Sequence, residues 1–350
     1  ARAGGGGALG PLRGAVGRLR EEADGRATGR GREDTERLLG ALRELVAALR
    51  AMPPEVLAGG VPGAAWRGGR PPSRGIQCAR LLRSALCSLA RLGPRARRHV
   101  QAALAALDDA LEVAAPFCSI ADLSHVFCSY ATLCQRPPPA TEAALLGALE
   151  AACDAPDAPP AGASAPTVSR LCYGLARLRL HPGPLVAGAI EAGAACPELD
   201  LWPEHLAMVA WFWQRVGHRP AEGPLLDVGR RLLFGAAELR PRDLAMALHA
   251  VCHLRAPVAV QFLLVCEDRL VGAAKRRSDG RLPLAPAGMA QVLGAYVALG
   301  RAPLPALVSA LEAGAVANMD RFGFPLLSKT LGSYCRLGLQ PGAEVWEALV

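Results

Sequence analysis

The sequence is poor in aromatic residues and has no long apolar run. Phe, Trp and Tyr make up 5% of the 350 residues, although 51% of all residues are hydrophobic. The excess consists of Ala and Leu, a composition typical of packed helices. The longest apolar run, residues 256–266, is shorter than the roughly 18 residues of a membrane span and is interrupted by Pro257 and Gln261. We therefore expect a helical protein that does not associate with a membrane.

Motifs of catalysis and metal binding are also missing. The chain contains no P-loop, no dinucleotide-binding GxGxxG after a strand, no GxSxG and no HExxH. The eleven Cys include no CxxC pair, which argues against a zinc module and against a secreted disulfide scaffold. We expect the Cys to be small core residues in a reducing compartment, and we expect a protein that is not an enzyme and holds no cofactor or metal.

The chain does contain an internal repeat. One pattern occurs twice: a Tyr, then Leu-Gly starting three residues later, then Pro three residues after the Gly. The two copies lie 38 residues apart. The copies are Tyr296, Leu299, Gly300, Pro303 and Tyr334, Leu337, Gly338, Pro341. Self-similarity at a fixed period of about 20 to 50 residues is the signature of a solenoid.

Weaker copies of the pattern extend through the preceding sequence. The residues equivalent to Leu299 stand 41, 45, 38, 38, 45 and 38 residues apart. They are Leu92, Leu133, Leu178, Val216, Leu254, Leu299 and Leu337. Three separations equal 38 and the others are longer, as expected if some units carry a longer loop. We call this position the repeat position.

Apolar residues recur ten, six and three positions before the repeat position. These offsets lie on one face of a 3.6-residue helix, so each unit should bury one stripe of its first helix. A Gly or Pro after the repeat position should end that helix, and a second apolar helix follows. The sequence predicts an all-α, right-handed α-solenoid of about seven helix pairs, each about 38 residues long.

Four segments follow from composition. Residues 1–32 are rich in Gly, Ala and Arg, and we expect a disordered segment and a candidate transit peptide. Residues 33–57 should form an amphipathic helix, either a degenerate repeat or a cap, and residues 58–76 a Gly/Pro/Arg linker. Residues 77–350 form the helical-repeat domain. We expect it to continue beyond residue 350, because an apolar end would otherwise remain uncovered.

The outward side of the first helices predicts the functional surface. One residue before the repeat position, four of the seven units carry Arg. They are Arg91, Arg177, Arg215 and Arg336. Eight residues before it, the side chains are diverse and mostly polar, and include Ser84, His125, Arg170, Gln291 and Lys329. Stacked units would place cations in one row and variable side chains in another, so the Arg could hold phosphates while the variable side chains face bases.

The net charge of +8 fits a polyanionic partner without identifying it. The alternative that these Arg bind no ligand remains open, because exposed helix faces are polar and this chain is rich in Arg. The sharpest metal candidate is His249 with His253, one helical turn apart and beside Cys252, but a fourth ligand is not evident. We expect a packed Cys with two polar neighbours instead.

The repeat resembles the octotricopeptide repeat family and its relatives, the heptatricopeptide and RAP-associated repeat proteins of organelles. The resemblance lies in the unit of 38 residues, the Leu/Ala-rich second helix, and a first helix that ends in aromatic-Ala-x-Leu-Gly-x-x-Pro. Residues 130–137 and 296–303 are near that form. It covers residues 77–350. The Pro that often opens the first helix is present at Pro241, Pro286 and Pro325.

The resemblance implies a nuclear-encoded protein of the mitochondrial matrix or the chloroplast stroma. Such a protein would bind single-stranded RNA, either rRNA or an organellar transcript, and support RNA maturation, stability or translation. It could also contact ribosomal or RNA-processing proteins. The alternative from a different class is a non-catalytic protein-binding scaffold, or a structural subunit of a large assembly such as the mitochondrial ribosome.

Overall fold

The fold is built from helices. The computed structural model describes residues 9–25, 32–53, 56, 73–92, 97–153, 162–278 and 282–348. These residues form α-helices joined by turns and short 3-10 helices, and none of them lies in a β-strand. The expected all-α class is therefore confirmed. The chain divides into two compact units, residues 1–189 and 190–350, which are considered separately.

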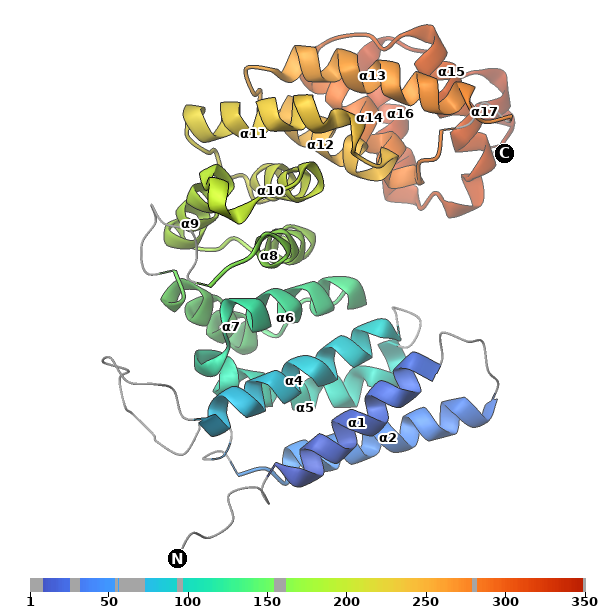
Figure 1. The fold of residues 1–350 in the computed structure, drawn as a ribbon. Coiled ribbons are helices and arrows are strands. Elements are labelled where there is room, and N and C mark those ends of the chain that lie inside the picture. Colours follow the sequence, from blue (N-terminus) through green and yellow to red (C-terminus); the bar gives the residue numbers. More distant parts are fainter. Residues whose placement is uncertain are drawn as a thin grey trace, which may run out of the picture. The chain divides into compact units, whose positions relative to one another are not determined.

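The helices of the first unit alternate between two layers (Figure 1). In one layer α1 packs on α4, α4 on α6 and α6 on α8; in the other, α2 packs on α5 and α5 on α7. Their bounds are α1 (Gly10–Gly25), α2 (Arg32–Arg50), α4 (Ser73–Arg91), α5 (Arg97–Ala114), α6 (Ile120–Leu133), α7 (Pro139–Ala151) and α8 (Ala165–Leu178). Helix α9 (Pro184–Ala195) contains the boundary between the units.

The second unit repeats this arrangement. Helices α10, α12, α14 and α16 pack in sequence, and so do α11, α13, α15 and α17. Their bounds are α10 (Pro203–Val216), α11 (Glu222–Phe234), α12 (Pro241–His253), α13 (Ala259–Lys275), α14 (Pro286–Leu299), α15 (Pro305–Ala317), α16 (Phe324–Leu337) and α17 (Ala343–Glu347). Short 3-10 helices follow some second helices: η3 (Ala115–Phe117), η4 (Pro197–Leu199), η5 (Gly235–Ala237) and η6 (Met319–Arg321).

Each first helix ends at the repeat position or one residue before it. Helices α6, α8, α10, α14 and α16 end at that position, and α4 and α12 end one residue earlier. The apolar stripe is buried as expected: in α6, Leu123, Phe127 and Tyr130 have no exposed side-chain surface. Burying such large side chains contributes about 1.5–3 kcal/mol each.

The ends of the first helices share one backbone conformation. The residue after the helix is left-handed at Gly217, Gly300 and Gly338, with φ of 71°, 62° and 66°. Cys134 and Arg179 adopt the same conformation, with φ of 52° and 55°. In all five cases the chain turns at the position where the sequence predicts a stop, with or without the Gly that makes a left-handed cap inexpensive.

Carboxylates on the second helices bind the start of the next second helix. Glu191 of α9 accepts a 2.9 Å hydrogen bond from the backbone N–H of Ala221, the residue before α11. The N–H groups before α15 and α17 donate in the same way, Leu304 to Glu267 at 2.6 Å and Gly342 to Glu312 at 2.9 Å. We call these three contacts the carboxylate clips. They satisfy a helix-terminal donor and connect consecutive helix pairs.

The same position in the first unit carries Asp108 on α5. There the residue before α7 is Pro138, which has no N–H to donate. The Asp108 carboxylate instead accepts a hydrogen bond from the hydroxyl of Tyr130 on α6. Burial raises the pKa of Asp108 to about 6, although this hydrogen bond opposes the shift. A missing donor thus leaves a buried carboxylate less well satisfied than at the carboxylate clips.

The expectation of disorder over residues 1–32 is wrong for residues 10–25. Helix α1 buries Leu12, Val16 and Leu19 against α2 and α4. Its polar side chains also make contacts, because Arg13 donates a 2.8 Å hydrogen bond to Gln77 of α4. Helices α1 and α2 pack like the later pairs, and a further pair therefore precedes α4.

The described residues cover only part of the other predicted segments. Helix α2 begins at Arg32, where the sequence predicts an amphipathic helix. Most of the predicted linker, residues 58–72, lies outside the described residues, and α4 begins at Ser73, within the predicted linker.

Candidate functional site

The four predicted phosphate-binding Arg lie at the ends of first helices. Arg91 is the last residue of α4, and the other three are the last but one residues of α8, α10 and α16. All four side chains are exposed. Cations in the last turn also favour the helix dipole, by about 0.3–1 kcal/mol, so this position has a structural benefit that does not require a ligand.

Two of these Arg already have partners in the first unit. Arg91 forms an ion pair with Asp24 of α1, with 2.5 Å between Nη1 and Oδ1. Arg177 of α8 contacts the sulfur of Cys134 at 3.8 Å. Because an acidic partner must be displaced before Arg91 can bind a phosphate, Arg91 is a weaker candidate than Arg177.

The predicted base-facing residues of the first unit come together with an Arg that the sequence interpretation left out. Arg83 stands next to Ser84 on α4 and forms a 2.9 Å ion pair with Asp122 of α6. Burial, and then the charges of Arg170 and Arg83, lower the pKa of His125. Cationic groups from α4 and α8 therefore lie near His125 on α6, and Ser84 is half-buried.

In the second unit, the predicted residues Arg215 and Lys329 come from helices at opposite ends of the first-helix layer. Arg215 belongs to α10 and Lys329 to α16, with α12 and α14 between them in the packing order. The pKa of Lys329 is nevertheless lowered, mainly by burial and also by the charge of Arg215. Gln291 is half-buried on α14, and Arg336 is exposed at the end of α16.

Between these two cations lie the histidines of α12. The rings of His249 and His253 stack with centroids 4.0 Å apart and an angle of 23° between planes. Burial lowers the pKa of His249 to about 2, and the charges of His253, Lys329 and Arg215 act in the same direction. Partial burial also lowers the pKa of His253, and Lys329 contributes. We call Arg215, His249, His253 and Lys329 the His253 cluster.

The His253 cluster does not include a thiol ligand. Cys252 is fully buried, and burial raises its pKa to about 12. A protonated core thiol is a poor metal ligand. Within the described residues, no group of three or more His, Cys, Asp or Glu side chains has the arrangement of a metal site.

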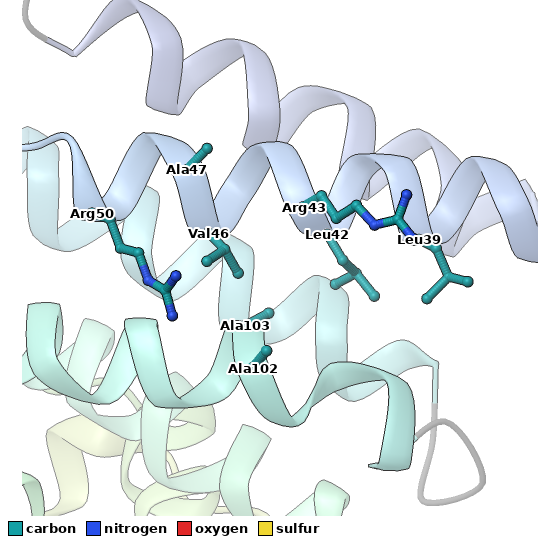
Figure 2. Close-up of a pocket in the computed structure, with 8 residues that line it drawn as sticks. All are labelled: Leu39, Leu42, Arg43, Val46, Ala47, Arg50, Ala102 and Ala103. Atoms are coloured by element: carbon teal, nitrogen blue, oxygen red, sulfur yellow. The ribbon is translucent and has the colours of Figure 1, made fainter.

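A groove runs along the second-helix layer of the first unit. Its volume is about 410 Å³, and its lining is mainly apolar. Figure 2 shows Leu42 and Val46 of α2 beside Ala102 and Ala103 of α5, with the side chains of Arg43 and Arg50 along the groove. The Arg pair gives this otherwise apolar surface a positive rim.

Two further observations bound the chemistry of the chain. No helix in the described part is both long enough and apolar enough to cross a bilayer. All eleven cysteines are free thiols, and the buried ones, such as Cys78 and Cys118, have pKa values raised by burial.

Sequence reasoning missed Arg83, Asp24 and the stacking of the two His rings. Arg83 is one position away from the predicted row, and a helical face is wide enough to include both positions. Asp24 lies on α1, a helix that was not expected. His249 and His253 were considered only as metal ligands, whereas their neighbours are cations.

Compared with known proteins, the chain matches no family model and shows no significant match to a curated protein. The functional argument therefore rests on the geometry of the chain itself.

Proposed function

We propose that this protein is a non-catalytic, single-stranded RNA-binding α-solenoid. Its first helices would form one continuous row of about seven repeats, each about 38 residues long, with the RNA lying along their outward side. Phosphates would be held by cations at the helix ends, and bases would meet the more variable side chains half-way along each helix.

Several features support a solenoid. Within each unit, first helices pack on first helices and second helices on second helices. The carboxylate clips recur at the same structural position, before α11, α15 and α17. Contacts that connect each pair only to its neighbours are the defining property of a repeat array.

The observation that carries the RNA proposal is the His253 cluster. The charge of Arg215 acts on Lys329, and both charges act on His249, so three helices direct cationic or basic groups toward one region. Like charges repel one another, and a polyanion relieves that repulsion. A helix-dipole role explains Arg215 but leaves Lys329 unexplained, because Lys329 lies in the first half of α16.

The roles of the individual residues follow from their contacts. Arg177, Arg215 and Arg336 are the phosphate-binding candidates, and Arg91 would join them only by releasing Asp24. Ser84, His125, Arg170 and Gln291 are the base-facing candidates. Lys329, whose pKa is lowered in part by the charge of Arg215, would bind phosphate together with it.

The resemblance to octotricopeptide repeat proteins supports a place in an organelle. On this proposal the protein resides in the mitochondrial matrix, or in the chloroplast stroma, and binds rRNA or an organellar transcript during maturation, stabilisation or translation.

Salt dependence tests the proposal. Binding of a labelled, mixed-sequence single-stranded RNA should weaken linearly with the logarithm of salt concentration. Replacing Arg177, Arg215 and Arg336 by Gln should lower the slope by about 2, since each phosphate contact contributes about 0.7 for single strands. The matched control replaces Arg230, Lys275 and Arg276, which are exposed on or next to the second helices α11 and α13. Equal loss of slope in both triple variants would reject the assigned surface.

A protein-binding scaffold is the second candidate, and the groove between α2 and α5 favours it. An apolar groove with a positive rim suits an amphipathic helix that carries acidic side chains. Crosslinking the tagged protein in cells and sequencing the attached RNA separates the candidates. Recovery of rRNA indicates a ribosomal role, one transcript indicates a specific maturation factor, and an absence of RNA favours the scaffold.

A further inference from the structure

The hydrogen bond of His253 defines which ring nitrogen carries a proton. Nδ1 of His253 lies 2.9 Å from the backbone carbonyl oxygen of His249. A carbonyl oxygen can only accept, so Nδ1 is the donor. In the neutral ring Nε2 then has a free lone pair, and after protonation Nε2 becomes a charged donor.

The ring of His249 stacks against the ring of His253. His249 is 6% exposed, and neither of its ring nitrogens has a hydrogen-bond partner within the described part of the chain. Buried ring nitrogens without a hydrogen-bond partner destabilise a fold, so the position of His249 is not explained by packing alone. Of the two stacked rings, His253 is the exposed one, and its Nε2 is the ring nitrogen that a ligand can reach.

A Gly on α14 makes room for the stacked rings. A β-carbon at Gly294 would lie 3.2 Å from Nε2 of His249 and 3.8 Å from Cε1 of His253. Any other residue at this position would press on the ring of His249. Helix α14 thus packs closely against the two rings at a residue that has no side chain.

The charges that act on the two rings are positive. His249 is influenced by Arg215 from α10 and by Lys329 from α16, and His253 by Lys329. From α12 itself, each ring faces the other. Helix α14 contributes Gly294 beside the rings. Among the described residues, no acidic side chain contributes to the shifts at His249, His253 or Lys329.

We propose that the His253 cluster is a phosphate-binding site that takes up a proton at His253 when a phosphate binds. The phosphate would accept charge-assisted hydrogen bonds from Arg215, from Lys329 and from protonated Nε2 of His253. This inference rests on the proposed RNA-binding function, in which the phosphate belongs to the RNA backbone. Free phosphate has the same chemistry, and the experiment distinguishes the two sources.

The direction of the pH effect follows from linkage. Without ligand, burial and Lys329 hold the pKa of His253 below its usual value of 6.5. A bound anion favours the charged ring and raises this pKa. Binding is then tighter at low pH, and the effect develops between the two pKa values. His249 remains neutral because its burial is nearly complete.

The test combines two measurements on the full chain. First, the pKa of His253 is measured by NMR of ¹³C-labelled His rings, alone, with single-stranded RNA and with inorganic phosphate. We expect RNA to raise the pKa of His253, and the ring of His181, an exposed loop residue, serves as the reference signal. Second, RNA affinity of His253→Gln is compared with that of the wild type at pH 6 and pH 8, with His181→Gln as control. The loss should be about threefold to tenfold larger at pH 6.

The outcomes separate the two proposals. RNA binding without any change in the pKa of His253 overturns the phosphate site and leaves the RNA-binding function. A rise in this pKa with inorganic phosphate but no RNA binding at any pH supports the phosphate site and overturns the RNA-binding function. Absence of both responses overturns both. Circular dichroism of each variant verifies that the fold is intact.

Discussion

The carboxylate of Glu267 accepts a hydrogen bond from the backbone N–H of Leu304, 37 residues later in the chain. The donor belongs to the residue that precedes α15, and the acceptor lies on the preceding second helix, α13. Glu191 and Glu312 each accept the same kind of hydrogen bond from a backbone N–H that lies 30 residues later in the chain. The extra seven residues at Glu267 are shared between the longer C-terminal part of α13 and the longer connection between α13 and α14.

Removing a carboxylate clip should destabilise the second unit. Glu267 is 6% exposed, so Glu267→Ala leaves the N–H of Leu304 without its partner and should cost about 1–3 kcal/mol. Asp268→Ala, at the exposed neighbouring position, is the control and should change stability by less than about 0.5 kcal/mol. Chemical denaturation measures both. Equal losses of stability in the two variants would mean that the hydrogen bond between Glu267 and Leu304 does not stabilise the fold.

Asp108 should make the protein more stable as pH falls from 7 to 5. Its pKa is raised to about 6 in the folded state, so the folded state binds the proton more strongly than the unfolded state does. Asp108→Asn should remove this pH dependence and stabilise the protein at pH 7.5 by roughly 1–3 kcal/mol. Thermal unfolding at several pH values measures the effect. The exposed Glu112 on the same helix, replaced by Gln, should leave the dependence unchanged.

Introducing Gly at a left-handed cap should stabilise the fold. Arg179 ends α8 with φ of 55°, a conformation that costs a side-chain-bearing residue about 1–2 kcal/mol. Arg179→Gly relieves this cost but increases the entropy of the unfolded chain, so the net gain should be about 0.5–1 kcal/mol. Arg179→Ala retains the β-carbon and should give no gain. A gain with Ala would attribute the effect to the lost charge instead.

Lys329 should control the titration of the His253 cluster. Its charge lowers the pKa values of His249 and His253, so Lys329→Gln should raise the pKa of His253 toward 6.5. NMR titration of the His rings measures the shift. Lys275→Gln removes the same charge at the end of α13 and should leave His253 unchanged; an equal shift in both variants would indicate only a general effect of net charge.

Helix α1 should contribute to the stability of the first unit. Leu19 has no exposed surface, and Leu19→Ala should therefore cost about 2–5 kcal/mol. Arg20→Ala, on the exposed side of the same helix, should have little effect. Hydrogen exchange of the α1 amides gives an independent measurement, since a segment without stable structure would exchange at the rate of an unfolded peptide.

The sequence was most informative where each residue type has a single structural use. Leu299 followed by Gly300 predicts a helix end because the apolar stripe stops there and Gly favours the left-handed turn. Cys134 and Arg179 show that the turn persists without Gly, because packing of the following helix imposes it. The stripe could be found because it recurs within one helix, at spacings that loop length does not change.

Other features could not be found in this way. Leu12, Val16 and Leu19 carry the helical spacing of α1, but the surrounding Gly and Arg give its sequence the composition of a disordered segment. The ion pair between Arg91 and Asp24 depends on α1 and was therefore missed with it. The carboxylate clips join two helix pairs, and their separation in the sequence varies with loop length, so no fixed spacing identifies them.

The carboxylate clips also bear on how such a chain can grow. Glu267 and Leu304 lie on consecutive helix pairs and supply the two halves of a single contact. A gene duplication that copies one period at a carboxylate clip would therefore deliver a new acceptor together with the donor that it requires. The joint before α7 differs, since Pro138 has no N–H to donate. The array can thus be lengthened from within at the three carboxylate clips, whereas a unit added at Pro138 would attach less firmly.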